Sequence, residues 1–382
     1  MPSPAQAIDL TAGRLSVDVG AIVRNWQALD QISPSALTGA VVKANAYGLG
    51  MREIAPALFT AGARFQFVAT PEEGLLLRDL LPLAHIFVFD GLWPGAADIY
   101  AQERLMPVVN SMPMLEEWLR FCLARGEAYP AALHFDTGMN RLGFRVSDAE
   151  QVRSRLAEAG YKPQMLMSHL ACADIPEHEK NRIQLALFQT VLLQFPDIPA
   201  SIANSAGLMS SKAHHFQLVR PGIALYGGRA ISGRTNPMAQ VVTLEAPILQ
   251  IREARAGETV GYGAVARLQR DSRLAILPLG YADGFFRSLG SSTARAGSKI
   301  FVRGRAAPVI GRVSMDLFAA DITDLGAGLP SPGEYAEIIG PNVTIDDHAD
   351  AGGTIGYEVL TALKGRYTRH YVNAVASVSK AS

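Results

Sequence analysis

The chain has 382 residues, 49% of them hydrophobic, and carries 35 basic and 35 acidic side chains for a formal net charge of zero at pH 7. Charges of both signs are interspersed, with no basic stripe and no Lys/Arg run beside an amphipathic helix, so neither nucleic acid nor a membrane surface is an expected partner. Cys122 and Cys172 are too few for a disulfide scaffold or a metal framework, and the N-terminus lacks a signal-peptide pattern, so we expect no metal and a cytoplasmic location.

Short apolar runs alternate with helix-period segments over the first 230 or so residues. Eight runs are found, at residues 38–43, 65–69, 85–90, 106–109, 131–136, 164–168, 200–204 and 217–219. Helices are predicted between them at residues 51–60, 71–80, 112–125, 148–159 and 177–194. Strands buried on both faces read as continuous apolar runs. The pattern therefore favours a (β/α)8 barrel of the TIM type, with a doubly wound open sheet as the competing layout.

The pattern changes at the turn-rich residues 232–237 (SGRTNP). Alternating stretches follow, punctuated by Gly and Pro, and residues 356–363 predict a short helix among them. We therefore predict two domains: a barrel over residues 12–235 and a mostly antiparallel β domain over residues 236–382, with the first 11 or so residues packing against the latter.

The first apolar run ends on Lys43 and continues into a Gly-rich loop. Active sites of such barrels lie where strands end at the C-terminal face. A lysine beside a low-dielectric wall favours its neutral amine, which can form a Schiff base with an aldehyde. The alternative is a surface lysine that merely closes the strand.

The segments after the seventh and eighth runs predict a phosphate site. They read NSAG at residues 204–207 and RPGIALYG at residues 220–227. Loops at these two places often bind phosphate in barrels. Ser205 offers a hydroxyl, while Gly222 allows close backbone approach and, with Ile223, can present N–H groups to an anion. An ordinary Pro-Gly turn is the alternative.

Residues 42–50 (VKANAYGLG) closely resemble the pyridoxal-phosphate attachment signature of the alanine racemases, a fold type III family. Further segments resemble the family in order: DTGMNRLG at residues 136–143, VGYGA at 260–264, GYADG at 280–284, RVSMD at 312–316 and GTIGYE at 353–358. The resemblance runs from about residue 17 to residue 371. It implies a pyridoxal 5'-phosphate-dependent isomerase that interconverts L- and D-alanine and works as a homodimer with shared active sites. D-alanine for the cell wall is the implied product of a biosynthetic member, and a catabolic role stays open.

The resemblance also implies roles around the cofactor. Lys43 would carry it covalently, and its phosphate would meet Tyr47, Ser205, Gly222, Ile223 and Tyr357. Arg220 would face the pyridine nitrogen, with His169 hydrogen-bonded to that arginine. An arginine stays protonated and donates only, so the ring stays neutral and is a weak electron sink, which suppresses transamination. Leu49 departs from the His that many members carry.

Further roles concern the substrate. Arg141 would bind its carboxylate, because a guanidinium pairs with a carboxylate in bidentate fashion. Met315 and Asp316 of the partner subunit would surround it. The resemblance places the remaining matches at the substrate entry: Asp174, Tyr281, Arg287 and Arg312. Many members have a carbamylated lysine seven residues before the arginine, where this chain has His134. An imidazole cannot supply that negative charge, so we expect a neutral His134 or a bound anion nearby.

Racemisation needs a base on each face of the substrate. By resemblance Lys43 serves the D-enantiomer, and Tyr262 of the partner subunit serves the L-enantiomer. A phenol needs a cationic neighbourhood to act as a base near neutral pH. The competing interpretations are a broad-specificity or serine racemase, a barrel-only pyridoxal-phosphate homeostasis protein and a fold-related decarboxylase. The second domain with residues 260–263 argues against the last two.

Overall fold

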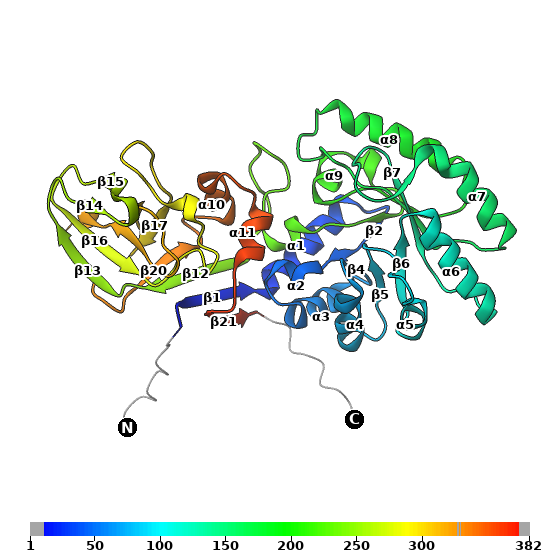
Figure 1. Cartoon of the computed structure of the whole chain (residues 1–382), viewed down its shortest axis with the longest axis horizontal. Helices are drawn as coiled ribbons and strands as arrows, with labels where there is room; N and C mark the ends of the chain where they lie inside the picture. Colours follow the sequence, from blue (N-terminus) through cyan, green and yellow to red (C-terminus); the bar gives the residue numbers. More distant parts are fainter. Residues whose placement is uncertain (1–10, 327, 329, 374–382) are drawn as a thin grey trace, which may run out of the picture. The chain divides into compact units, whose positions relative to one another are not determined.

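The computed structural model describes residues 11–326, 328 and 330–373, which form two compact units (Figure 1). One unit holds residues 20–239, and the other holds residues 11–19 together with residues 240–373. The expectation for the first 11 or so residues falls almost wholly on residues 1–10, which lie outside the described part, as do residues 374–382 of the second predicted domain.

The unit of residues 20–239 is a parallel barrel. Its sheet runs β10-β9-β7-β6-β5-β4-β3, and β11 pairs in parallel with β2. The Gln217 amide donates to the Ala200 carbonyl (3.1 Å) and the Arg220 amide to the Ala203 carbonyl (2.9 Å), so β10 also joins β11 and the sheet closes. The closed sheet confirms the barrel over the open doubly wound layout. The first strand is β2 (Leu37–Thr38) with β3 (Ala40–Val41), and the others are β4 (Phe65–Val68), β5 (His85–Val88), β6 (Leu105–Val109), β7 (Ala132–Asp136), β9 (Met165–Met167), β10 (Ala200–Ser201) and β11 (Leu218–Val219).

Helices connect these strands. The five predicted segments are present as α3 (Met51–Ala61), α4 (Pro71–Leu80), α6 (Met112–Arg125), α7 (Ala149–Glu158) and α8 (Glu179–Leu192). Helix α4 begins at a capping box, in which the Thr70 hydroxyl accepts from the Glu73 amide and the Glu73 carboxylate accepts from the Thr70 amide. The structure contains four further elements beyond those predicted: α1 (Val19–Ile32), α5 (Ala97–Gln102), α9 (Ser205–Ser210) and the short β8 (Phe144–Arg145) beside β7.

The other unit is built on a nine-stranded sheet with the order β13-β16-β19-β18-β17-β20-β12-β1-β21. Its neighbouring strands are antiparallel except β1 and β21, so the predicted mostly antiparallel β architecture is confirmed. The strand β1 (Gly13–Asp18) pairs here with β12 and β21. The sheet strands are β12 (Val242–Pro247), β13 (Gln250–Ala254), β16 (Ser272–Leu277), β17 (Lys299–Val302), β18 (Arg305–Ile310), β19 (Phe318–Asp321), β20 (Tyr335–Ile339) and β21 (Tyr367–Val372), accompanied by the hairpin β14 (Thr259–Val260)–β15 (Ala266–Arg267), α10 (Ile345–Gly352) and α11 (Gly356–Ala362).

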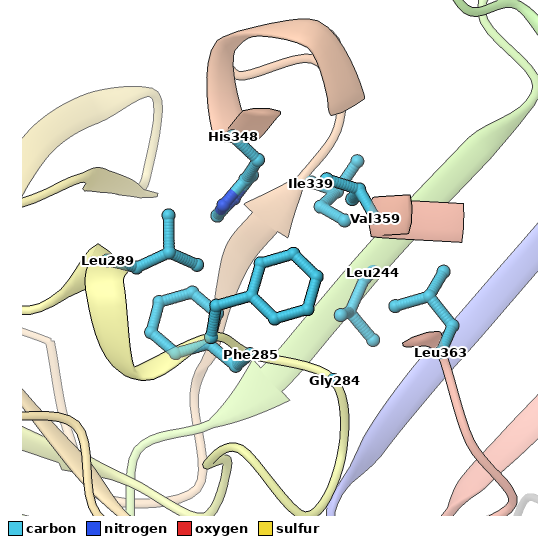
Figure 2. Close-up of a pocket in the computed structure, with 9 residues that line it drawn as sticks. Leu244, Gly284, Phe285, Leu289, Ile339, His348, Val359 and Leu363 are labelled. Carbon is cyan, nitrogen blue, oxygen red and sulfur yellow. The ribbon is translucent and has the colours of Figure 1, made fainter. Parts of the chain in front are cut away.

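A small cavity of about 10 Å³ lies in this unit, where the side chains labelled in Figure 2 face one another. The Phe285 ring stacks on Phe318 at 4.4 Å between centroids and meets the His348 ring edge-on at 5.6 Å. His348 is itself engaged through Nε2 with the Ile338 carbonyl oxygen. The cavity is at the lower limit for one water, and its other walls are apolar, so it is a packing defect of the core. No helix in the described residues is long and apolar enough to cross a bilayer.

Candidate active site

Lys43 begins a short turn, α2 (Lys43–Tyr47), directly after the first barrel strand. It is half-buried, and its Nζ lies 5.8 Å from the centroid of the Phe89 ring. Burial, followed by the positive charge of Arg141, lowers the pKa of the Lys43 amine, while Glu73 and Asp90 oppose this. The strand end therefore favours the neutral, nucleophilic amine that the sequence predicts.

The four residues after Lys43 form a left-handed turn. The φ angles of Ala44, Asn45, Ala46 and Tyr47 lie between 53° and 56°. Left-handed helical backbone costs roughly 1–2 kcal/mol per non-glycine residue, so contacts must over-determine this conformation. Hydrogen bonds inside the loop supply part of that support: the Ala46 amide donates to the Val42 carbonyl (2.8 Å) and the Gly48 amide to the Ala44 carbonyl (2.7 Å).

The turn brings Tyr47 to the loop after the eighth strand. Ser205 Oγ accepts from the Gly222 amide at 2.8 Å and from the Ala224 amide at 3.3 Å. A Cβ added to Gly222 would lie 2.1 Å from the Tyr47 phenol oxygen, so only glycine allows this approach. The Tyr47 ring stacks on Tyr226 at 4.5 Å between centroids.

A phosphate group fits the Tyr47 phenol, the Ser205 hydroxyl and the Ile223 amide, while the Gly222 amide donates to Ser205 and Gly222 contributes the space for close approach. Ile223 is the first residue of a 3₁₀ turn, where N–H groups lack acceptors within the turn. The structure thus brings together Tyr47, Ser205, Gly222 and Ile223, the four members of the predicted phosphate set that lie in the barrel.

Arg220 is buried at the end of β11, with 3% of its surface exposed. Its guanidinium donates to the Ser201 hydroxyl and to the Ser168 carbonyl, the latter at 2.7 Å. Burial lowers the pKa of Arg220 to about 9, which still leaves it protonated at neutral pH. Its orientation is therefore set by two serines inside the barrel.

His169 follows Ser168 directly, but its ring makes no hydrogen bond to Arg220 among the described residues. Its backbone carbonyl accepts from Gln184 Nε2 at 2.9 Å. Burial and then the positive charge of Arg220 hold the pKa of His169 well below its usual range, so the imidazole is neutral. The histidine–arginine bond that the resemblance implies is not among the described contacts of Arg220 and stays a prediction.

His134 lies on β7, where its Nδ1 is 2.8 Å from Asn110 Oδ1. The Asn110 amide nitrogen donates to the Val108 carbonyl (2.7 Å) and the Phe89 carbonyl (3.2 Å), which leaves Oδ1 as the atom facing the histidine. His134 Nδ1 must therefore donate. Burial, followed by the charge of Arg220, lowers the pKa of His134 to about 4. The expected neutral, hydrogen-bonded His134 is what the structure contains.

Arg141 is exposed in the loop after β7, and no described residue forms a hydrogen bond or ion pair with its guanidinium. The Asp136 carboxylate shapes that loop by accepting from three successive amides, those of Gly138, Met139 and Asn140. A guanidinium held out on an ordered loop is available to a carboxylate.

Asp174 lies in the barrel unit, where its carboxylate accepts from the Ser232 hydroxyl at 3.2 Å. The other remaining predicted residues lie in the β unit, where Arg287 begins a 3₁₀ turn. Tyr262 starts a 3₁₀ turn and is 73% exposed, lining an open groove of about 970 Å³ together with Arg312 and Leu317. Met315 is 53% exposed, and Asp316 forms an ion pair with Arg366 at 2.8 Å. Tyr357 is on α11. Within this unit, the Tyr281 amide donates to the Ser314 carbonyl (3.1 Å), which ties two predicted segments together.

Several residues around the site were missed by sequence reasoning. Asn110 directly follows the fourth strand, β6, and this place at the barrel's strand ends is a signal that could have identified it. Ser168 and Ser201 are far from Arg220 in the sequence. Both contact it only because the barrel closes. Glu73 belongs to the capping box of α4, and its carboxylate also accepts from the Ala44 amide in the turn after Lys43.

The comparisons with known proteins cover both units. Two family models match: "Alanine racemase, N-terminal domain" over residues 17–230 and "Alanine racemase, C-terminal domain" over residues 241–371. The chain is 47% identical over 368 residues to the alanine racemase of Rhizobium meliloti (strain 1021), covering 94% of this chain and 97% of that relative. It is 46% identical over 368 residues to "Alanine racemase, biosynthetic" of Agrobacterium fabrum (strain C58 / ATCC 33970), covering 94% of each.

Among solved structures, it is similar to the crystal structure of alanine racemase from Bartonella henselae with covalently bound pyridoxal phosphate. That likeness has a TM-score of 0.89 at 37% identity and covers 95% of this chain and 100% of that chain. Because family models and full-length relatives agree over both units, the chain belongs to the alanine racemase family.

Proposed function

We propose that this chain interconverts L-alanine and D-alanine with pyridoxal phosphate, using Lys43 and Tyr262 of the partner subunit as two bases. The observation that carries the proposal is the half-buried Lys43, whose pKa is lowered, in the same turn as Tyr47, which reaches the cradle at Gly222. This cofactor requires two features at the face of a barrel. One is an amine that favours its neutral form, and the other is a cradle for the phosphate anion.

The barrel residues bind and orient. Tyr47, Ser205, Gly222 and Ile223 would hold the phosphate, and the resemblance adds the phenol of Tyr357. Arg220, kept protonated and held by two serines, would donate to the ring nitrogen, which would then need no proton of its own. When bound, pyridoxal phosphate supplies an aldehyde and an electron-accepting ring. His169 stays neutral next to this arginine, so it adds no charge near the ring.

The substrate carboxylate pairs with Arg141, which places the α-carbon between two proton carriers. Lys43 Nζ removes or returns the α-proton on one face, and the phenol of Tyr262 of the partner subunit does so on the other. Met315 and Asp316 of the partner subunit border the substrate. Tyr262 is largely exposed in its own chain, which suits a residue that completes the site of a second copy. The active form is accordingly a homodimer.

The test mixes the purified chain with pyridoxal phosphate and L-alanine and follows D-alanine through a coupled D-amino-acid oxidase signal. Lys43→Ala should abolish D-alanine formation. Tyr262→Phe should cripple deuterium exchange from L-alanine more than from D-alanine, since only one face loses its base. Equal exchange from both enantiomers in Tyr262→Phe would refute the two-base assignment, and an active monomer in sedimentation would refute the shared site. Faster turnover of L-serine than of L-alanine would change the substrate.

A further inference from the structure

Glu73 joins two segments at the base of the Lys43 turn. Its Oε1 accepts from the Ala44 amide at 2.5 Å, and its Oε2 accepts from the Ala69 amide at 2.8 Å and the Thr70 amide at 3.4 Å. Ala44 is the first left-handed residue of the turn. One carboxylate therefore ties the end of the second barrel strand and the start of α4 to the residue that follows Lys43.

The amide of Ala44 needs such an acceptor. It stands at the start of a turn, where the first N–H groups have no acceptor within the turn itself. A carboxylate accepting from a backbone N–H forms a charge-assisted bond, which is about twice as strong as a neutral one. The hydrogen bonds inside the loop begin only at the Ala46 amide, so Glu73 supports the part of the turn closest to Lys43.

The charge of Glu73 also acts on Lys43 directly. Burial and Arg141 favour the neutral amine, and Glu73 is the first of the two carboxylates that oppose them. The same side chain thus holds the backbone of the lysine and moderates its protonation.

We infer that Glu73 is a positioning residue: its carboxylate locks the left-handed turn of residues 44–47 and so places Lys43 and Tyr47 for the cofactor. This inference rests on the proposed function, because it takes Lys43 as the anchor and base and Tyr47 as a phosphate contact. Glu73 itself touches neither the substrate nor the reacting atoms.

The variant that tests the inference is Glu73→Gln. A glutamine keeps the shape but has one acceptor oxygen, and its amide nitrogen can only donate, so it cannot serve the amides of both Ala44 and Ala69. Glu72→Gln is the matched control, because Glu72 is exposed on the same first turn of α4, and its loss changes the charge equally. Thr70→Ala is the second control: it removes the hydroxyl cap of α4 and leaves the Glu73–Ala44 contact in place.

Two measurements follow on all three variants. Amide hydrogen exchange of the peptide covering residues 43–50 needs no activity, and Glu73→Gln should speed it by about tenfold or more, the value of a charge-assisted hydrogen bond. The dissociation constant for pyridoxal phosphate, followed by its absorbance, should rise by about the same factor. Glu72→Gln and Thr70→Ala should leave both near the wild-type values.

Exchange in Glu73→Gln equal to that in Glu72→Gln would overturn the inference. So would equal acceleration in Thr70→Ala, because the effect would then come from a weakened α4. Faster exchange in Glu73→Gln with unchanged cofactor affinity would also overturn it, because the turn would then not position the cofactor contacts. A wild-type chain that binds cofactor but does not racemise alanine would refute the proposed function alone, since the exchange comparison reads the turn independently.

Discussion

Replacing His134 by glutamine should make the barrel less sensitive to acid. His134 is neutral in the fold because burial and then the charge of Arg220 lower its pKa to about 4, from an ordinary value near 6.5. A glutamine side chain can still donate to Asn110 Oδ1, which His134 Nδ1 contacts at 2.8 Å, and it does not ionise. Wild type and His134→Gln therefore differ mainly in the titration of this one imidazole.

The direction and size of this pH effect on stability follow from the difference in the His134 pKa between the folded and the unfolded chain. The folded-state pKa is depressed, so the stability that neutral His134 contributes is complete above about pH 6.5 and is lost as the pH falls towards 4. Lowering the pKa of His134 from 6.5 to about 4 corresponds to about 3 kcal/mol over that whole range. By about pH 5 the wild type should lose about 2 kcal/mol of unfolding free energy that His134→Gln keeps.

Urea unfolding at about pH 7.5 and about pH 5, followed by tryptophan fluorescence, measures this difference. Trp26, Trp93 and Trp118 all lie in the barrel, so the signal reports the unit that contains His134. His370→Gln, which removes an exposed imidazole on β21, controls for the loss of one histidine. If the unfolding free energy changed by the same amount between the two pH values in wild type and in His134→Gln, the neutral, buried histidine would be refuted.

Three further changes have definite expected outcomes. Gly222→Ala should weaken cofactor binding by at least about tenfold, because the new Cβ meets the Tyr47 phenol at 2.1 Å, and an absorbance titration measures it. Arg220→Glu should slow racemisation and raise pyruvate formation, because the ring nitrogen gains a proton and the ring becomes a better electron sink, and a lactate-dehydrogenase coupled assay detects the pyruvate. Phe285→Ala should destabilise the β unit by about 3–5 kcal/mol, since the ring packs on Phe318 and His348 beside an existing cavity. Circular dichroism together with hydrogen exchange measures the unfolding of that unit.

The barrel and its strand-end residues were predictable because their signals are local. Continuous apolar runs mark strands that are covered on both faces, and the residues that follow such runs lie together at one end of the barrel. Lys43 and Ser205 were found in this way, whereas the role of Arg220 came only from the resemblance. The helix α5, with only six residues, is too short for a clear period, and so it was missed.

The left-handed turn and the contacts that hold the site were not predictable in the same way. Alanine and tyrosine at positive φ contradict local preference, and only tertiary contacts such as that of Glu73 explain them. Ser168 and Ser201 are distant in sequence from Arg220 and meet it only because strands β9, β10 and β11 are neighbours in a closed sheet.

The charges at the barrel mouth bear on His134, at a position where the resemblance implies an acidic lysine derivative in many members. Burial first, and then the positive charges of Arg220 and Arg141, lower the pKa of His134 and of His169, so neither imidazole adds a cation. Arg141 also favours neutral Lys43. A negative group at position 134 would raise the lysine pKa again, whereas a neutral imidazole does not. A neutral His134 therefore leaves Arg141 available to the substrate carboxylate and adds no charge that would oppose the lowering of the Lys43 pKa.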